Sequence, residues 1–533
     1  MNALRVRMKP YIQPFERVLA LRELQSLAAA DARPLGLLEE TSTEFEVISV
    51  RSLQDLANRL SYWESIEHAT ESMLTTQSLR ESTVNLVRTG VAVQSLRQQL
   101  PFNGDVPLPQ RRCLRYGTHG VHEYRGKFFP QLVKSLINIS GIHPGAVVGD
   151  PMSGSGTTVV EAILSNCCGL GIDMNPLSVF LGSVKARLLS ADAEKLASSY
   201  ARVRSQLVSG GERTTKRLHY FHSLSSADQL YLSSWFSKPI LFQLDHIALL
   251  IRRVRDKVAA DLMRIALSNI LRRVSWQKED DLRVRKEVHP QESIDAEKEF
   301  LDELDRSFRA VLAFLFQNGL PSNPRFDITE GDARRCASHW GRCSLDLIVT
   351  SPPYATALPY LDTDRLSLIY LGLLPRPDHR SKDQEMIGNR EISEKVRRQY
   401  WDRFKSDGEQ LPGDVRDLIW RVNSLNEKVE VGFRRRNLPA LLAKYFFDMR
   451  DVMTGMHLAL KPKRFANVVV GNNHTIAGGI RVDIQTPSLL RQVAQAVGFV
   501  ATESLSMDML ISRDIFRKNA VSSEEILLLY KPA

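Results

Sequence analysis

The tetrapeptide from Ser351 to Tyr354 has the residue types needed to hold the amine of a nucleobase. The Ser351 hydroxyl and the Pro352 carbonyl could accept the two amine hydrogens, while Pro353 would stiffen the turn. An exocyclic amine is a poor nucleophile because its lone pair is delocalised into the ring, so two acceptors would help by favouring a pyramidal nitrogen. The Tyr354 ring could stack on the base, which is worth about 1–3 kcal/mol. Together with the glycine-rich segment Asp150–Thr158 earlier in the chain, the pattern indicates direct transfer of a methyl group to cytosine or adenine, catalysed mainly by positioning.

A glycine-rich segment about two hundred residues earlier, Asp150–Thr158, could hold the second reactant. It follows the apolar run Ala146–Gly149, and its Gly154 and Gly156 permit a tight turn and close approach of a ligand to the backbone. One predicted strand later, Asp173 stands where a carboxylate can hold ribose hydroxyls. These features predict a nucleoside site at the carboxyl edge of a sheet.

Two missing residues narrow the choice of nucleoside. Thr157 stands where a Walker A loop requires lysine. The third glycine of a G-x-G-x-x-G dinucleotide fingerprint is also absent after Gly156, and Glu161 follows five residues later. An anionic Asp150 would repel a pyrophosphate but would favour the cationic sulfonium and ammonium groups of S-adenosylmethionine (AdoMet). We therefore expect AdoMet as the cofactor.

Five short apolar runs bounded by Gly, Pro or Asp predict the strands of an open, mostly parallel α/β sheet. They are Ala146–Gly149, Gly169–Ile172, Leu345–Thr350, Asn467–Val470 and Glu525–Tyr530. The tetrapeptide directly follows the third run, and this position distinguishes it from the many Ser-Pro and Pro-Pro dipeptides that are only turns. Both polar segments should therefore lie at the same edge of the sheet, where open α/β sheets bind ligands.

The composition is that of an ordinary globular protein with an excess of positive charge. The 533 residues carry a formal net charge of +10, and no apolar stretch is long enough to span a bilayer. The five cysteines include no C-x-x-C pair, so we expect a reduced, cytoplasmic protein without a metal site. Between residues 252 and 286, eleven Lys and Arg face five Asp and Glu. This local excess suits a polyanionic partner.

The quoted residues resemble those of the amino-group DNA methyltransferases of bacterial restriction-modification systems. Asp150–Thr158 is similar to their AdoMet motif, although Met152 replaces the usual Phe, and Asp173 to their ribose-binding acidic residue. Asp332 resembles their adenine-contacting acidic residue, and the segment 119–131 resembles the one that covers the methionine end of AdoMet. A second departure is Lys463, which stands where these enzymes often have glycine.

The resemblance implies a Rossmann-like AdoMet-dependent methyltransferase sheet with helical inserts and an N-terminal accessory region. It implies catalytic roles for Ser351, Pro352, Pro353 and Tyr354. It implies cofactor-binding roles for Lys127, Phe128, Phe129, Pro130, Asp150, Pro151, Met152, Gly154, Gly156, Thr157, Thr158, Asp173, Met174, Asn175 and Asp332. In duplex DNA the target base must first leave the stack. The resemblance covers about half of the chain.

On this basis the chain divides into six parts. They are 1–105, a mainly helical accessory region; 106–184, the first, AdoMet-binding part of the methyltransferase domain; 185–322, a largely helical basic insert; 323–371, the catalytic part; 372–440, a second, polar insert; and 441–533, the last part of the sheet. Inserts of this length are usually functional. The first insert is our candidate DNA-recognition region, with Arg272, Arg273, Lys278, Arg283, Arg285 and Lys286 as candidate phosphate contacts.

Several alternatives stay open at this point. Ser351 as the first residue of the tetrapeptide is typical of the cytosine-N4 enzymes, whereas Asn or Asp is typical of the adenine-N6 enzymes. Methylation at cytosine C5 needs a Pro-Cys dipeptide, which is absent. An RNA-base methyltransferase and a DNA-binding protein with a vestigial core are the other readings. We expect double-stranded DNA as the partner and no association with a membrane. Whether a restriction or defence protein, or a second copy of the chain, also binds stays open.

Overall fold

The computed structural model describes most of the chain. The described residues are 2–28, 33–34, 42–124, 128–209, 217–278, 285–288, 294–319, 321, 324–355, 360–389, 391–430, 432–508 and 523–533. Within them, no helix is both long and apolar enough to cross a membrane. The same residues contain no group of three or more His, Cys, Asp or Glu side chains able to hold a metal ion.

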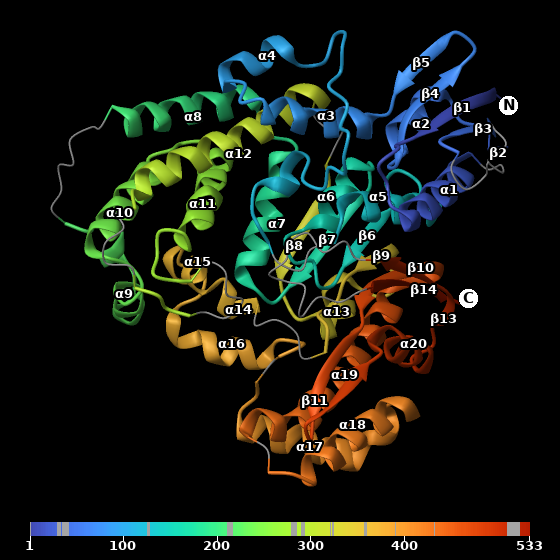
Figure 1. The fold of residues 1–533 in the computed structure, drawn as a ribbon, viewed down its shortest axis with the longest axis vertical. Coiled ribbons are helices and arrows are strands. Elements are labelled where there is room, and N and C mark those ends of the chain that lie inside the picture. Colours follow the sequence, from blue (N-terminus) through green and yellow to red (C-terminus); the bar gives the residue numbers. More distant parts are fainter. Residues whose placement is uncertain are drawn as a thin grey trace.

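A seven-stranded sheet lies at the centre of the molecule, in the order β13-β14-β10-β9-β6-β7-β8 (Figure 1). Its strands are β6 (Val147–Asp150), β7 (Cys168–Asp173), β8 (Phe326–Glu330), β9 (Leu345–Thr350), β10 (Leu460–Gly471), β13 (Val500–Asp508) and β14 (Ser523–Lys531). From β8 to β10 neighbouring strands are parallel, whereas β14 runs antiparallel to both β10 and β13. This is the predicted Rossmann-like α/β fold.

The strand order reverses between β6 and β9. The chain moves outward from β6 to β7 and β8, then returns to place β9 on the other side of β6. Open α/β sheets bind ligands outside the carboxyl ends of the strands at such a switch point. Asp150 is the last residue of β6, and Ser351 directly follows β9.

Helices cover both faces of this sheet. On one face lie α5 (Pro130–Ile139), α6 (Thr157–Leu164) and α7 (Pro176–Leu188), and on the other lie α13 (Cys336–Trp340), α19 (Phe433–Ala459) and α20 (Thr486–Ala496). All six residues of β9 are buried, because helices pack against both sides of the strand. The continuous apolar run that predicted this strand is the expected pattern for such a position.

The first hundred residues differ from the prediction of a mainly helical region. They contain a five-stranded antiparallel sheet in the order β2-β3-β1-β4-β5. The strands are β1 (Asn2–Met8), β2 (Arg33–Pro34), β3 (Glu44–Ser49), β4 (Trp63–His68) and β5 (Glu71–Leu74), and the helices are α1 (Pro14–Ala28), α2 (Leu53–Arg59), α3 (Thr76–Arg88) and α4 (Leu96–Gln99). In β1 the buried Leu4 and Val6 alternate with exposed arginines, so one face of the strand packs inward while the other meets solvent.

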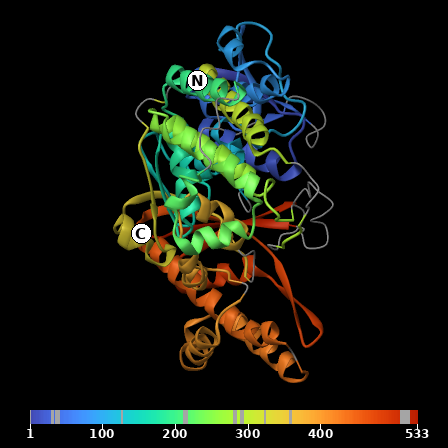
Figure 2. The ribbon, with the colours of Figure 1, turned by 90° about the vertical axis from the view of Figure 1, so that its left-hand side faces the viewer.

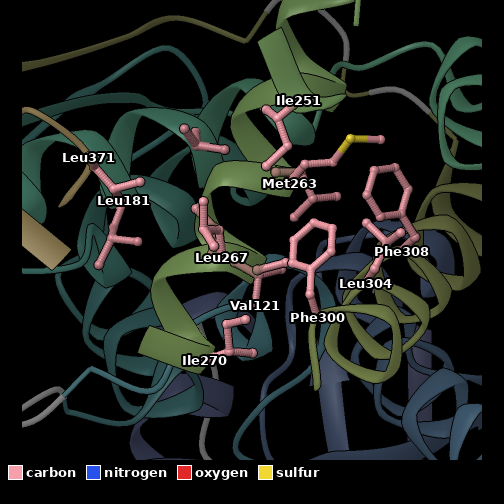
Figure 3. Close-up of a cluster of buried hydrophobic side chains, with 14 of the residues drawn as sticks. Val121, Leu181, Ile251, Met263, Leu267, Ile270, Phe300, Leu304, Phe308 and Leu371 are labelled. Carbon is pink, nitrogen blue, oxygen red and sulfur yellow. The ribbon is translucent and has the colours of Figure 1, made fainter. Parts of the chain in front are cut away.

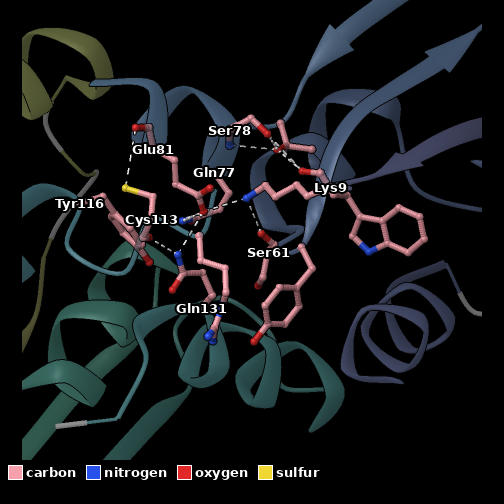
Figure 4. A network of polar contacts seen from close by, with 12 residues as sticks. Lys9, Ser61, Gln77, Ser78, Glu81, Cys113, Tyr116 and Gln131 are labelled. Carbon is pink, nitrogen blue, oxygen red and sulfur yellow. Dashed lines mark hydrogen bonds and ion pairs between the residues drawn. The ribbon is translucent and has the colours of Figure 1, made fainter. Parts of the chain in front are cut away.

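A buried polar network joins this N-terminal region to α5 (Figure 4). Lys9 forms an ion pair with Glu81 at 2.7 Å and donates to the carbonyl of Ser61, and Gln131 of α5 also donates to Glu81. Both members of the ion pair are almost completely buried. Burying two charges is tolerated because further hydrogen bonds satisfy them, so the network fixes the two regions in one arrangement.

The insert between α7 and β8 contains the helices α8 (Ala193–Val208), α9 (Ser226–Ser233), α10 (Lys238–Arg252), α11 (Lys257–Leu271) and α12 (Ala296–Asn318). Leu267 of α11, Phe300 and Leu304 of α12 and Leu181 of α7 meet in one buried cluster (Figure 3). The insert therefore packs on the helix that follows β7, close to the switch point.

The second insert forms an arm that projects from the sheet (Figures 1 and 2). After the short helices α14 (Tyr360–Thr363), α15 (Arg365–Tyr370) and α16 (His379–Glu385), it contains α17 (Glu394–Asp407), α18 (Gly413–Glu427) and the beginning of α19. The hairpin of β11 (Asn473–Ala477) and β12 (Ile480–Ile484) packs along α18. Short 3-10 turns η1 to η6 span Val93–Ser95, Gly117–Gly120, Phe221–Ser223, Ala333–Arg335, Arg376–Asp378 and Gly408–Gln410.

Candidate active site

The glycine-rich segment and the tetrapeptide are joined at the switch point by threonine hydroxyls. Thr350, the last residue of β9, donates to Asp150 Oδ1 at 2.7 Å. Thr158, at the start of α6, donates to Asp150 Oδ2 at 2.8 Å and is 3.1 Å from the Val349 carbonyl oxygen. The end of β9 and the turn after β6 are therefore held in one fixed arrangement, directly before Ser351.

The Asp150 carboxylate connects the end of β6 with β9 and α6. Its carboxylate also accepts the Met152 amide at 3.1 Å, and its side chain has no exposed surface. Burial raises its pKa to about 6, although the three hydrogen bonds oppose that rise. A ligand in the turn would thus feel the charge of Asp150 without touching the carboxylate.

The turn itself requires glycine at Gly156. This residue has a positive φ of 80°, and a Cβ there would stand 2.8 Å from the Cα of Gly182 in α7. The turn lets α6 begin at Thr157 with its first amides directed toward the switch point. Within the described residues, the buried hydroxyls of Ser153 and Ser155 have no hydrogen-bond partner. Such orphaned groups at a turn fit a polar ligand. Both serines lie within Asp150–Thr158, but nothing in the local sequence distinguishes them from other turn residues.

Asp173 lies at the end of β7, beside the same turn. Its carboxylate accepts the amides of Gly154 and Asn175, each at 2.8 Å, one on each oxygen. Burial raises its pKa to about 6, against these two hydrogen bonds. Each carboxylate oxygen has a second lone pair that could accept a ribose hydroxyl. The structure therefore places the Asp173 carboxylate beside the glycine turn, and its role in holding ribose hydroxyls stays a prediction.

Asn175 caps a helix in the structure, and its predicted contact with the cofactor stays a prediction. Its side-chain oxygen accepts the Leu177 amide at 3.0 Å and so caps α7, while its amide donates to Asp364 at 3.1 Å. The side chain is almost completely buried. These bonds fix the beginning of α7, whereas the neighbouring Met174 remains partly exposed.

Asp332 lies beside Asp173 but is engaged by an arginine. The amide of Gly331 donates to the backbone carbonyl of Asp173 at 3.0 Å, which brings the two acidic residues to neighbouring strand ends. Asp332 forms an ion pair with Arg334 at 2.8 Å, and Arg334 forms another with Asp448. Burial acts to raise the pKa of Asp332, but the guanidinium outweighs it and the pKa is lowered. A ligand at Asp332 would therefore share the carboxylate with Arg334.

The segment expected to cover the cofactor divides into two parts. Tyr124 lies over the turn, because a Cβ on Gly154 would stand 3.1 Å from its ring, and its hydroxyl is 2.8 Å from the hydroxyl of Ser178. Lys127 lies outside the described residues. Phe129 caps α5, which begins at Pro130. The Arg112 guanidinium carbon lies over the Phe129 ring, 4.8 Å from its centre.

Phe128 belongs to the same cluster of apolar side chains as the N-terminal region. Behind the turn, Glu161 accepts hydrogen bonds from Tyr116 and His119 in a fully buried group. His119 thus supports α6 from behind, and Phe128 to Pro130 pack between the two parts of the protein.

The tetrapeptide is held from two sides. Tyr445 of α19 donates its hydroxyl to the Pro353 carbonyl at 3.0 Å, and the Tyr354 hydroxyl donates to Glu524 at the beginning of β14. Burial raises the pKa of Glu524, against the hydrogen bond from Tyr354. Neither the Ser351 hydroxyl nor the Pro352 carbonyl accepts a hydrogen bond from the described part of the chain. The two acceptors needed for an amine are thus available, on a backbone that its neighbours fix.

The predicted phosphate contacts are partly engaged within the protein. Arg273 pairs with Glu299 at 3.3 Å, and Lys278 pairs with Glu287 at the same distance. Lys286 stacks on Trp276 and Arg272 donates to the carbonyl of Lys278. Arg285 lies beside them in the described residues, whereas Arg283 lies outside. These are exposed contacts of little energy, so they reduce the availability of the cations without removing it.

A family model described as "RMKL-like, methyltransferase domain" matches residues 121–197. The match begins at the segment that covers the turn and continues through α6, β7 and α7. The chain contains an AdoMet-dependent methyltransferase domain. Its turn, strand end and covering tyrosine are the parts of that domain described above.

Two relatives match over a longer stretch, which covers most of this chain. The Type II methyltransferase M.BsoBI of Geobacillus stearothermophilus is 21% identical over 421 residues, which cover 72% of this chain and 78% of the relative. The Type II methyltransferase M.MvaI of Kocuria varians is 25% identical over 393 residues, which cover 70% and 81%.

Solved structures give only a weak likeness to the methyltransferase chain. TrmN from Thermus thermophilus is 11% identical with a TM-score of 0.33, over 100% of both chains. The rRNA methyltransferase aviRa from Streptomyces viridochromogenes is 10% identical with a TM-score of 0.29, over 77% of this chain and 88% of that one. At such TM-scores neither structure bears on the substrate.

Proposed function

We propose that this chain is a site-specific DNA methyltransferase that transfers a methyl group from AdoMet to the N4 amine of cytosine in duplex DNA. The observation that carries the proposal is the pair of hydrogen bonds that Thr350 and Thr158 donate to the Asp150 carboxylate. These bonds fix the glycine turn and the tetrapeptide at adjacent strand ends. The likeness of about 70% of the chain to two Type II methyltransferases supports DNA as the substrate.

The residues around the turn fit AdoMet. Asp173 offers carboxylate lone pairs to ribose hydroxyls, and the orphaned hydroxyls of Ser153 and Ser155 lie in the turn itself. The buried charge of Asp150 would favour a cationic ligand at short range. AdoMet, when bound, supplies an electrophilic methyl group on a sulfonium.

The tetrapeptide would position the amine that attacks. Ser351 Oγ and the Pro352 carbonyl oxygen would accept the two amine hydrogens and so direct the nitrogen lone pair toward the turn. The Tyr354 ring, whose hydroxyl is fixed by Glu524, would stack on the base with a gain of about 1–3 kcal/mol. This gain offsets part of the few kcal/mol needed to take the base out of the duplex.

Ser351 is the reason to prefer cytosine N4 over adenine N6 within this proposal. Serine is typical of the cytosine-N4 enzymes at this position, whereas the adenine-N6 enzymes have Asn or Asp, whose carbonyl or carboxylate oxygen lies further from the backbone than the serine hydroxyl. The alternative product, N6-methyladenine, is distinguished by the same experiment.

Methylome sequencing of DNA from cells that express this chain tests the proposal. We expect N4-methylcytosine at one recognition sequence, and none in cells that express the Ser351→Ala variant at the same level. N6-methyladenine alone would overturn the assignment of the base. DNA without modification, together with methylated RNA, would overturn the assignment of the substrate.

A further inference from the structure

The end of the arm is a compact unit built from three elements. Here the tip means residues 426–430, 432–436 and 476–480. They are the end of α18 with the three residues that follow it, the N-cap and first turn of α19, and the turn of the hairpin β11–β12. The side-chain oxygen of Asn426 accepts the Gly478 amide at 2.9 Å, and its amide donates to the Arg435 carbonyl at 2.7 Å. Asn426 is only 7% exposed. One buried side chain therefore ties the three elements together.

The hairpin turn is fitted closely to α18. Gly478 has a φ of 57°, and a Cβ there would stand 2.3 Å from the Leu425 carbonyl oxygen. Only glycine satisfies both conditions. The tip is thus a fixed surface, and the direction of its exposed side chains is set by the fold.

That surface combines three arginines with exposed apolar side chains. Arg434, Arg435 and Arg436 are all exposed in the first turn of α19, directly after Phe433. The exposed large apolar side chains of the tip are Val429, Phe433, Ile476 and Ile480. Arg434 forms an exposed ion pair with Glu391, a kind of contact worth at most about 1 kcal/mol, so it can exchange for a phosphate. Exposed apolar groups beside cations mark a binding surface.

The tip is connected to the tetrapeptide by two rigid elements. Asn473, the first residue of β11, donates to the Ala355 carbonyl, directly after Tyr354. Gly478 lies five residues after Asn473 along the hairpin, a reach of about 17 Å. On α19, Tyr445 contacts Pro353 and lies nine residues after Arg436, a reach of about 14 Å. Both paths give a distance of about four to five nucleotide spacings along a DNA strand.

We propose that the tip binds duplex DNA four to five base pairs from the target base, with Arg434, Arg435 and Arg436 on backbone phosphates. The apolar side chains around Phe433 contact the groove between them, as apolar wedges do in other DNA-binding proteins. The tip is a better candidate than the cluster around Arg272, because Arg435 and Arg436 have no acidic partner in the described residues. This assignment rests on the proposed function, since it takes DNA as the substrate.

The test compares the salt dependence of DNA binding among four proteins. They are the wild type; Arg434→Ala/Arg435→Ala/Arg436→Ala; the same three positions changed to Lys; and the control Arg5→Ala/Lys195→Ala/Arg202→Ala, which removes three exposed cations from the opposite end of the molecule (Figure 1). Fluorescence anisotropy with a 30-base-pair duplex of mixed sequence gives the slope of log Kobs against log salt concentration. Each lost phosphate contact should reduce the slope by about 0.9.

We expect the alanine triple to reduce the slope by about 2 to 3, while the lysine triple and the control keep the wild-type slope. Affinity for AdoMet, measured by calorimetry, should be unchanged in all four proteins, which shows that the fold is retained. An unchanged slope in the alanine triple, or an equal loss in the control, would overturn the assignment of the tip. If the wild type binds DNA through the tip but methylates none, the proposed function fails while the assignment stands.

Discussion

Replacing Asp173 by asparagine should weaken the binding of AdoMet strongly while leaving the protein folded. The carboxylate accepts one amide on each oxygen, so an asparagine must direct its NH2 group at one of two N–H donors. One turn contact is then lost, and one acceptor for a ribose hydroxyl becomes a donor. Hydrogen bonds to a charged group are worth about 1.5–3 kcal/mol. At about 1.4 kcal/mol per factor of ten, the Kd should rise by about 10–150-fold.

Isothermal titration calorimetry with AdoMet measures this change directly. Asp346→Asn is the matched control, because Asp346 is a buried carboxylate of the same sheet that also accepts a backbone amide, from Val147, and pairs with Lys461. It lies near the beginning of β9, at the opposite edge of the sheet. The control should lose stability and keep its AdoMet affinity. An unchanged Kd in Asp173→Asn would refute the role of this carboxylate in holding the cofactor.

Three further predictions concern Asp173, the tetrapeptide and the two arginines of the first insert. Burial raises the pKa of Asp173 to about 6, so its carboxylate is ionised and able to accept hydrogen bonds above that pH. AdoMet affinity should therefore be constant above pH 7 and about tenfold lower near pH 5. An affinity that calorimetry finds unchanged between these pH values would contradict this. Ser351→Ala and Tyr354→Ala should reduce kcat much more than AdoMet affinity because both act on the base, and an equal loss of cofactor binding would show that the tetrapeptide is misplaced. Neutralising Arg272 and Arg273 together should flatten the salt dependence of DNA binding by less than the change at the tip, since both arginines already contact the protein; an unchanged slope would assign them to an ordinary solvated face.

The sequence predicts the centre of the fold well because that region is buried on both faces. The strand Leu345–Thr350 agrees with the prediction at both ends, since only a continuous apolar run can fill such a position. The outer strands β8 and β13 are missing from the prediction, because they alternate apolar and polar residues at the edges of the sheet. The strand β1 is missing for the same reason, and with it the whole N-terminal sheet.

In the site, too, the sequence predicts residues that form a local motif but not their partners from distant parts of the chain. The turn after Asp150 and the tetrapeptide at Ser351 have local patterns, so the sequence can indicate them. Glu524 and Tyr445 hold the tetrapeptide from more than ninety residues away, and no spacing in the sequence connects them with it. The pattern around Asn175 is ambiguous, because a cofactor motif and a helix cap can have the same residue type at the same position, and the structure shows the cap.

The central claim is the transfer of a methyl group to the N4 amine of cytosine, and labelled AdoMet tests it most directly. Purified protein is incubated with duplex DNA of high sequence complexity and AdoMet that carries a deuterated methyl group, and the digested nucleosides are analysed by mass spectrometry. We predict deuterated N4-methyl-deoxycytidine with the wild type and none with Ser351→Ala. Deuterated N6-methyl-deoxyadenosine as the sole product, or a deuterated product that persists in Ser351→Ala at the wild-type rate, would contradict the account.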